Sequence, residues 1–222
     1  VTTLVPIFFN ALAKSAGLNE DLYLSYWGYA GSIATILVAI LGPICGTLAD
    51  RKMKKQFFLV TMLVGALCCA VLGFAPGWLA FLCLFILARV GYSSSLIFYD
   101  AMLPEVTDDK RMDNVSATGY ALGYIGSVIP FIVCLVLVLF AGSFGISTGT
   151  AMAIAFLITA GWWVLLTLPL LKRYRQVSFV EPEAHPFVDS FRRLGTTLGK
   201  VKQEKHIFLY LLAFFFFIDG VY

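Results

Sequence analysis

Charged residues are scarce in this sequence. Only 13% of its 222 residues are Asp, Glu, Lys or Arg, whereas 60% are hydrophobic. A soluble globular chain usually carries about 25% charged residues. These residues cannot supply a polar shell for a core of this length, so we expect a lipid bilayer to face most of the surface. We expect no nucleic-acid partner.

Histidine is rarer still, and cysteine occurs without a ligand pattern. The only histidines are His185 and His206. A membrane-embedded enzyme would need a His/Asp/Glu cluster or a Ser/His set near the membrane surface, and none is visible. The cysteines all lie inside apolar runs, without metal-ligand spacing. They are Cys45, Cys68, Cys69, Cys83 and Cys134. We therefore predict that the protein is not an enzyme and has no cofactor or metal.

The sequence also lacks the alternating pattern of a β-barrel, whose strands are segments of about 10 residues. Its apolar runs are instead long enough for helices that cross a bilayer. We predict an all-α, polytopic transmembrane helical bundle. The complete spans cover about 22–48, 57–75, 78–101, 115–141 and 150–171, with a partial span at 1–13 and another from 206.

The chain opens inside one apolar run and stops inside another, so we expect both ends to be cut. Six spans and the start of a seventh correspond to half of a twelve-helix protein. We predict an N-terminal six-helix bundle at 1–171, a cytoplasmic linker at 172–205 and the start of a C-terminal half at 206–222. Apolar residues at helical spacing in the linker indicate an amphipathic helix on the inner leaflet, or else a solvated connection.

Basic residues fall on one side of the predicted spans. Of the 16 Lys and Arg residues, 14 lie in the segments after the second, fourth and sixth spans. Cytoplasmic loops are enriched in these residues. We predict that the loops joining spans 2–3, 4–5 and 6–7 are cytoplasmic.

The second span ends in a small residue, an acid and a basic cluster. Gly46, Asp50, Arg51, Lys54 and Lys55 resemble the loop 2–3 signature of the major facilitator superfamily. The family usually has a glycine inside that loop, but this sequence has Met53 there. Gly46 would let a neighbouring helix approach closely. Asp50 could pair with a cation or a helix N-terminus in a contact that changes when two halves rock.

A second pattern runs from the fourth span into the fifth. Asp100 is followed by a turn at a Leu-Pro-Glu element and then by Gly119 and Gly123, whose spacing permits close helix crossing. With Asp219 in the last span, this resembles the vacuole-effluxer-like, autophagy-related branch of the superfamily. The glycoside and cation symporter branch has a similar Leu-Pro-Glu element and remains the alternative. Asp100 is a candidate gate or helix cap.

Arg89 is the most unusual residue of the spans. It lies eleven residues into the fourth span, or about 16 Å from its start, and so near mid-bilayer. A central Arg costs at least about 2.5 kcal/mol, so it should face a wet cavity or a carboxylate. It either binds a substrate carboxylate or forms a fixed ion pair. Asp219 is its candidate partner, or else a proton or cation site.

Three further residues are candidates for substrate contact. Asn10, Tyr26 and Tyr92 are polar or amphipathic groups inside spans. Tyrosines near a membrane interface are also common as belt residues.

The resemblance implies a secondary active transporter that moves a small polar solute by alternating access. Amino acids are one candidate substrate, and protons or another cation could be coupled. The partners are then the bilayer, the solute and the missing C-terminal half, in a bacterial inner (plasma) membrane. The alternatives are a symporter of the glycoside-pentoside-hexuronide type and a non-transporting membrane scaffold.

We expect residues 1–222 alone to carry no transport, because half of the binding cavity would be missing. Purified 1–222 in proteoliposomes should show no saturable flux of any solute. Saturable flux from this segment would contradict the prediction that it is one half of a transporter.

Overall fold

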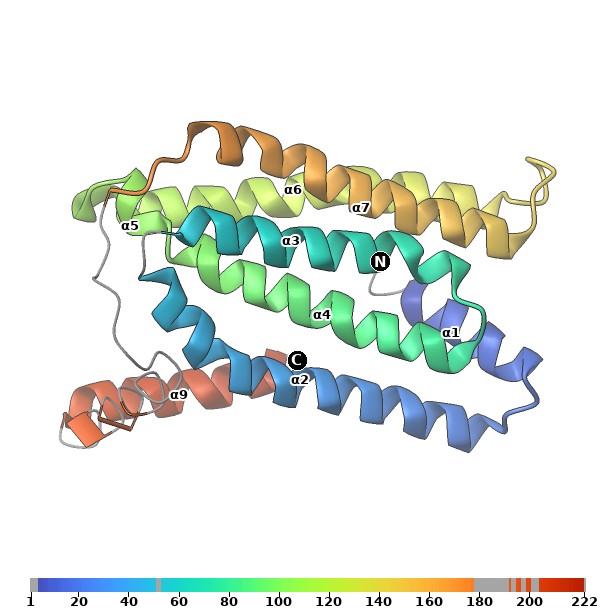
Figure 1. Cartoon of the computed structure of the whole chain (residues 1–222), viewed down its shortest axis with the longest axis horizontal. Coiled ribbons are helices and arrows are strands. Elements are labelled where there is room, and N and C mark those ends of the chain that lie inside the picture. The colour runs from blue at the N-terminus through green and yellow to red at the C-terminus, as the bar shows by residue number, and fades with distance from the viewer. Residues whose placement is uncertain are drawn as a thin grey trace. The chain divides into compact units, whose positions relative to one another are not determined.

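The computed structural model describes residues 4–50, 53–177, 192, 195–196, 199–200 and 204–221, of which 218–221 only by their backbone. The chain divides into two compact units, Val1–Val180 and Glu181–Tyr222, which are treated separately (Figure 1). Most of the predicted linker, including the positions expected to form its amphipathic helix, lies outside the described residues. The predicted domain boundaries therefore remain predictions.

Every regular element among the described residues is a helix. In the first unit these are α1 (Leu4–Ser15), α2 (Glu20–Ala49), α3 (Lys54–Val71), α4 (Trp78–Asp100), α5 (Leu103–Val106), α6 (Met112–Leu139) and α7 (Thr148–Arg173), and in the second α9 (Lys205–Val221). Short 3₁₀ turns at Leu72–Phe74 and Asp109–Arg111 extend α3 and precede α6.

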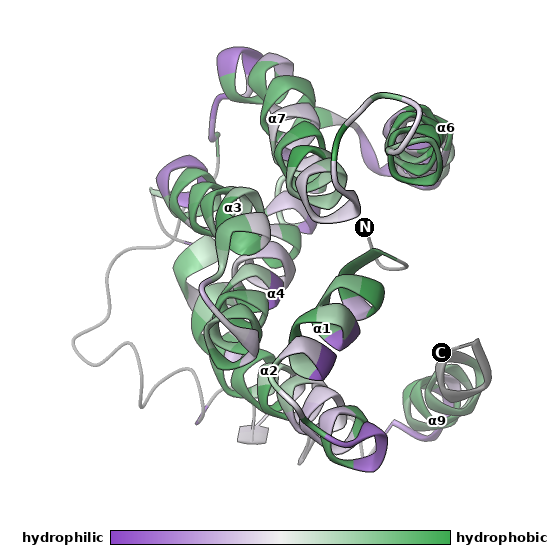
Figure 2. Ribbon diagram, turned by 90° about the vertical axis from the view of Figure 1, so that its right-hand side faces the viewer, coloured by the Kyte–Doolittle hydropathy of each residue, from purple (hydrophilic) through white to green (hydrophobic). Residues whose placement is uncertain are grey.

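Five of these helices are long and apolar enough to cross a membrane: α2, α3 with its 3₁₀ turn, α4, α6 with its 3₁₀ turn, and α7. They match the five complete spans predicted from the sequence, with ends that differ by a few residues. Figure 2 shows hydrophobic residues along the lengths of these helices. The all-α, multi-pass membrane fold is therefore confirmed.

Helix α4 lies at the centre of the first unit. It packs against α2 on one side and α3 on the other, while α7 packs against α3 and α6 (Figures 1 and 2). The short helix α1 contacts the first half of α4, where Phe8 and Phe9 pack on Phe81 with ring centroids 5.6 and 6.1 Å apart. All three rings are buried. This aromatic cluster closes the end of the bundle near the α3–α4 connection.

A proline in α6 explains one contact between α6 and α7. Pro130 has no N–H, so the carbonyl of Gly126, four residues earlier, loses its helical partner. The Trp162 indole N–H of α7 donates a hydrogen bond to this carbonyl at 3.1 Å. Because lipid offers no hydrogen bonds, such a carbonyl has to be satisfied from a neighbouring helix. The contact ties α6 to α7 at the break.

Two glycines bring the backbones of α3 and α4 into contact. A Cβ on Gly91 would stand 2.7 Å from the Gly65 nitrogen and 2.9 Å from the Thr61 carbonyl oxygen. A Cβ on Gly65 would stand 2.9 Å from the Trp163 ring of α7. Only glycine at both positions permits this backbone contact, as in other membrane bundles where small residues meet.

The glycines expected to bring helices together are different ones. Among the described residues, a Cβ on Gly46 or Gly123 would meet nothing within 4 Å, and one on Gly119 would meet only the Tyr99 hydroxyl at 3.8 Å. None of the three meets a second backbone among the described residues, so close helix approach at these glycines stays a prediction. A small residue permits a crossing, but a second backbone has to lie opposite it.

The connection after α4 also differs from the prediction. Instead of a simple turn at Pro104, the chain forms the one-turn helix α5, with Pro104 in its first turn. Proline is tolerated there because the first helical N–H groups have no partner within the helix. This turn directs Glu105 back toward the start of α3.

We predict that Gly91→Ala destabilises the bundle, because the new methyl group collides with backbone atoms that cannot rotate away. The matched control is Gly28→Ala in α2, where a Cβ meets no atom within 4 Å. In the control alanine should be neutral, or stabilising by up to about 1 kcal/mol, because of its higher helix propensity. Thermal unfolding of both purified variants in detergent measures the difference. A Gly91→Ala midpoint equal to that of the control would contradict the crossing.

Candidate functional site

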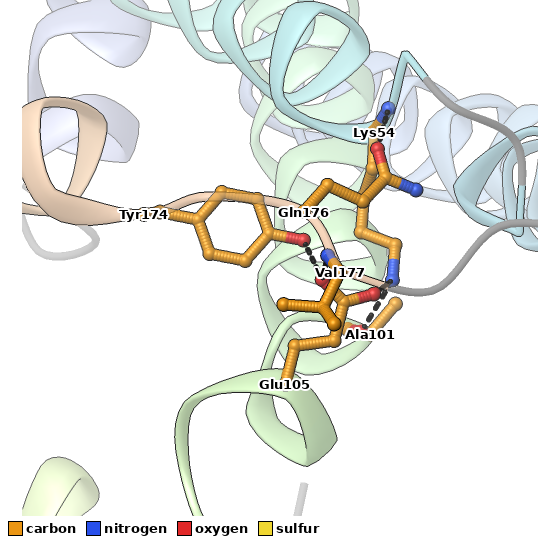
Figure 3. A network of polar contacts seen from close by, with 6 residues as sticks. All are labelled: Lys54, Ala101, Glu105, Tyr174, Gln176 and Val177. Atoms are coloured by element: carbon orange, nitrogen blue, oxygen red, sulfur yellow. Dashed lines mark hydrogen bonds and ion pairs between the residues drawn. The ribbon is translucent and has the colours of Figure 1, made fainter.

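A buried ion pair joins the start of α3 to α5. The Lys54 Nζ lies 2.7 Å from the Glu105 Oε1, and the two side chains are only 6% and 4% exposed. The same ammonium group donates a hydrogen bond to the Ala101 carbonyl, at the end of α4, at 2.9 Å. Figure 3 shows both contacts. One lysine thus holds together the ends of three helices.

The second carboxylate oxygen of Glu105 binds the segment that follows α7. The Tyr174 hydroxyl donates to Oε2 at 2.6 Å, and the Val177 backbone N–H donates to it at 3.2 Å (Figure 3). The Lys54 backbone N–H donates to the Gln176 side-chain oxygen at 3.2 Å. We call these residues, with Ala101, the Glu105 network.

The environment of the Tyr174 phenol, beside the ion pair, favours its neutral form. Burial raises the pKa of Tyr174, and the adjacent Glu105 carboxylate raises it further. The phenol therefore keeps its proton and remains a donor at neutral pH. The Glu105 carboxylate accepts from an ammonium, a hydroxyl and an amide group, so both of its oxygens have donors. The network contains no activated nucleophile, so its chemistry is to hold helix ends together.

Of the other basic-loop residues that resemble the superfamily signature, Lys55 contacts this network. The Lys55 Nζ donates to the Tyr174 carbonyl at 3.4 Å. Asp50 is exposed at the end of α2, and the structure shows no ion pair for it with any described residue. Arg51 lies outside the described residues. The changing contact predicted for Asp50 thus remains a prediction.

A second group of polar residues lies on one face of α4 and the facing part of α6. We call it the tyrosine face. It consists of Arg89, Tyr92, Tyr99 and Asp100 on α4, and Gly119, Tyr120, Gly123 and Tyr124 on α6. Every one of its side chains larger than glycine is exposed. The helical repeat explains the grouping, because positions 89, 92, 99 and 100 fall on one side of α4.

The two helices meet through side chains rather than backbones. The Tyr99 hydroxyl reaches toward α6, where Gly119 leaves room for it. Tyr120 is close enough to Asp100, Tyr99, Tyr92 and Tyr124 to interact with them electrostatically. The tyrosine face thus groups four tyrosines from two helices with one carboxylate, that of Asp100, at the end of α4.

Arg89 lies midway along α4, as predicted, and its side chain is exposed. The structure shows no ion pair between Arg89 and any described residue; both recorded pairs involve other side chains. Asp219 belongs to α9, but its side chain lies outside the described part of the chain. The predicted Arg89–Asp219 pair therefore stays a prediction.

The three remaining candidates occupy different environments. Tyr92 belongs to the tyrosine face and meets Trp163 edge to face, with centroids 5.7 Å apart. Tyr26 is half-buried and stacks on Trp78 at 5.0 Å, near the α3–α4 connection. Asn10 is half-buried in α1. Only Tyr92 thus shares a surface with Arg89 and Asp100.

Sequence reasoning missed several residues of both groups. Tyr99, Tyr120 and Tyr124 were not considered, although the helical repeat from Arg89 indicates Tyr99. Glu105 was noticed as part of a motif but was given no partner. Tyr174 and Gln176 carry no signal in the sequence, because their contacts join segments that are distant along the chain.

Known proteins resemble this chain over its whole length. The family described as "Vacuole effluxer Atg22 like" matches residues 14–222. The "Uncharacterized MFS-type transporter YxiO" of Bacillus subtilis (strain 168) is 42% identical over 227 aligned positions, which cover 100% of this chain and 53% of that protein. The chain thus spans about half the length of this curated relative. No solved structure matches.

Two fungal proteins are more distant. "Autophagy-related protein 22" of Yarrowia lipolytica (strain CLIB 122 / E 150) is 27% identical over 48% of this chain and 21% of its own length. The protein of the same name from Coccidioides immitis (strain RS) is 23% identical over 89% of this chain and 43% of its own length.

We predict that Lys54→Met or Glu105→Met alone destabilises the protein by about 3–5 kcal/mol, because each leaves one buried charge without its partner. The double variant should lose less than the sum of the two, because no buried charge remains. Thermal unfolding in detergent, compared in a double-mutant cycle, measures the coupling.

The control for these variants is Asp108→Ala. This residue pairs with Arg111 at 3.1 Å, but the two side chains are 81% and 71% exposed. Exposed pairs contribute little, so the unfolding midpoint should barely move. Single Lys54 or Glu105 variants that behave like this control would contradict the buried network.

Proposed function

We propose a function from one premise: the chain belongs to the vacuole effluxer Atg22-like family of major-facilitator-type transporters. On this proposal the segment is the first half of a secondary active transporter. It carries a small polar solute across the membrane by alternating access. Amino acids are the leading candidate substrates, with protons or another cation as possible coupling ions. The cellular membrane would be the bacterial plasma membrane.

The observation that carries the proposal is the exposed guanidinium of Arg89 in the middle of an apolar helix. A charge at this depth is costly against lipid and is found facing a water-filled cavity or a partner. The structure shows no ion pair for it among the described residues, and tyrosines and Asp100 share its face. A polar path through the bundle accounts for all of these groups on one side of α4.

In this mechanism Arg89 binds the solute near the middle of the membrane. A guanidinium presents two parallel N–H donors, which suits a carboxylate. The Glu105 network would keep the ends of α3, α4 and α7 together while this half moves against the other as a rigid body. Such rocking around a central site is typical of transporters built from structural repeats.

The orientation in the membrane is also proposed. Basic residues gather at the end of the bundle that carries the Glu105 network, so this end would face the cytoplasm. The match to the Atg22-like family favours this branch over the glycoside and cation symporters. A non-transporting scaffold would instead need Arg89 in a fully packed ion pair.

We predict that Arg89→Ala in the full-length protein lowers kcat/KM for the transported solute about 10- to 100-fold, the value of one or two charge-assisted hydrogen bonds. Arg89→Lys should restore only part of this, because lysine keeps the charge but cannot bind a carboxylate through two donors. Flux in proteoliposomes and protein abundance in membranes are measured together. Flux that falls only in proportion to abundance would indicate a structural role and contradict the proposal.

A further inference from the structure

Asp100 is the one acidic group of the tyrosine face, and the structure gives it no cationic partner. None of the ion pairs among the described residues includes it. The nearby ammonium of Lys54 is already bound to Glu105 and to the Ala101 carbonyl. Arg89 lies eleven residues away on the same helix, or about 16 Å. No cation of the described residues therefore lies within ion-pair distance of the Asp100 carboxylate.

The groups around Asp100 are phenol rings. Tyr99 is 44% exposed, Tyr120 60% and Tyr124 75%, so the described residues leave much of each side chain uncovered. Tyr120 stands within electrostatic reach of Asp100 and of the three other tyrosines. Gly119 opposite Tyr99 leaves space beside the hydroxyl. Two helices thus combine one carboxylate with several accessible rings.

This combination matches one ligand chemistry. An ammonium ion is attracted to the faces of aromatic rings and, more strongly, to a carboxylate. A small hard metal ion would instead need several oxygen ligands at short distance. We propose that the Asp100 end of the tyrosine face binds the ammonium group of the transported solute, with Asp100 as the counter-charge and Tyr99 and Tyr120 as the aromatic walls.

This inference rests on the proposed transport function and adds the residues that bind the ammonium group of the solute. The separation of Asp100 from Arg89 adds a second consequence. Eleven residues, or about 16 Å of helix rise, separate the backbone positions of Asp100 and Arg89, so on this proposal the two side chains bind different groups of the solute. Variants at the two positions should therefore discriminate between the two ends of a zwitterion.

The experiment uses the full-length protein in proteoliposomes and measures counterflow, which needs no ion gradient. The probes are leucine, leucinamide, N-acetylleucine, choline and glucose. Leucinamide keeps the ammonium group without the carboxylate, and N-acetylleucine keeps the carboxylate without the ammonium group. We expect saturable counterflow of at least one ammonium-bearing probe, and weaker transport of N-acetylleucine than of leucine.

Asp100→Asn should raise the KM for ammonium-bearing probes about tenfold or more, while leaving any residual transport of N-acetylleucine unchanged. Tyr120→Leu should raise the same KM about three- to tenfold, whereas Tyr120→Phe keeps the ring and most of the affinity. The Phe variant shows that the Leu variant does not act through misfolding. Asp113→Asn, an exposed acid at the start of α6, is the charge control and should have no effect.

Each other outcome has a defined meaning. Transport of glucose or N-acetylleucine alone would overturn the ammonium site and leave the transport function intact. An Asp100→Asn variant with unchanged KM for every probe, but without proton-driven accumulation, would assign Asp100 to a proton and also overturn it. Absence of saturable counterflow with all five probes would overturn the ammonium site, and a separate failure of any solute to be transported would overturn the transport function.

Discussion

The buried ion pair between Lys54 and Glu105 joins three segments of the first unit. It lies where the start of α3, the end of α4 and the segment after α7 meet, and each of these supplies a group to the same carboxylate or ammonium. Buried charges are costly unless their remaining donors and acceptors are also satisfied. Ala101, Tyr174 and Val177 satisfy them, so the contacts of this one pair tie the end of α4 to the start of α3 and to the segment after α7.

Different interactions stabilise the two ends of the bundle: aromatic packing at one end and hydrogen bonds at the other. Near the α3–α4 connection, Phe8, Phe9 and Phe81 pack through dispersion forces that depend weakly on direction. At the Glu105 end, hydrogen bonds between defined donors and acceptors join the start of α3, the end of α4 and the segment after α7. Between them, Gly65 and Gly91 bring two backbones into contact. The helices α3 and α4 therefore form a rigid pair, beside which α6 stands at side-chain distance and leaves the tyrosines accessible.

The candidate site was predictable in part. Depth along a helix is a count of residues, so the sequence alone placed Arg89 in the middle of α4, and the structure agrees. The same repeat places Tyr99 on the same face of α4, nearer its end. Tyr120 and Tyr124 could not be assigned, because they come from α6 and their orientation depends on how that helix packs. Gly119 and Gly123 illustrate the same limit: their spacing suggested a helix crossing, but no backbone lies opposite them among the described residues.

The sequence by itself determined that the protein lies in a lipid bilayer, that it is helical, and approximately where its membrane spans begin and end. Lipid imposes these properties on any chain of such composition, because every backbone group must be paired inside its own segment. Only the tertiary structure decided which glycines touch, that Lys54 is paired with Glu105 rather than solvated at the membrane surface, and that four tyrosines and Asp100 share one face. Those choices depend on contacts between residues far apart in the chain, which no local pattern specifies.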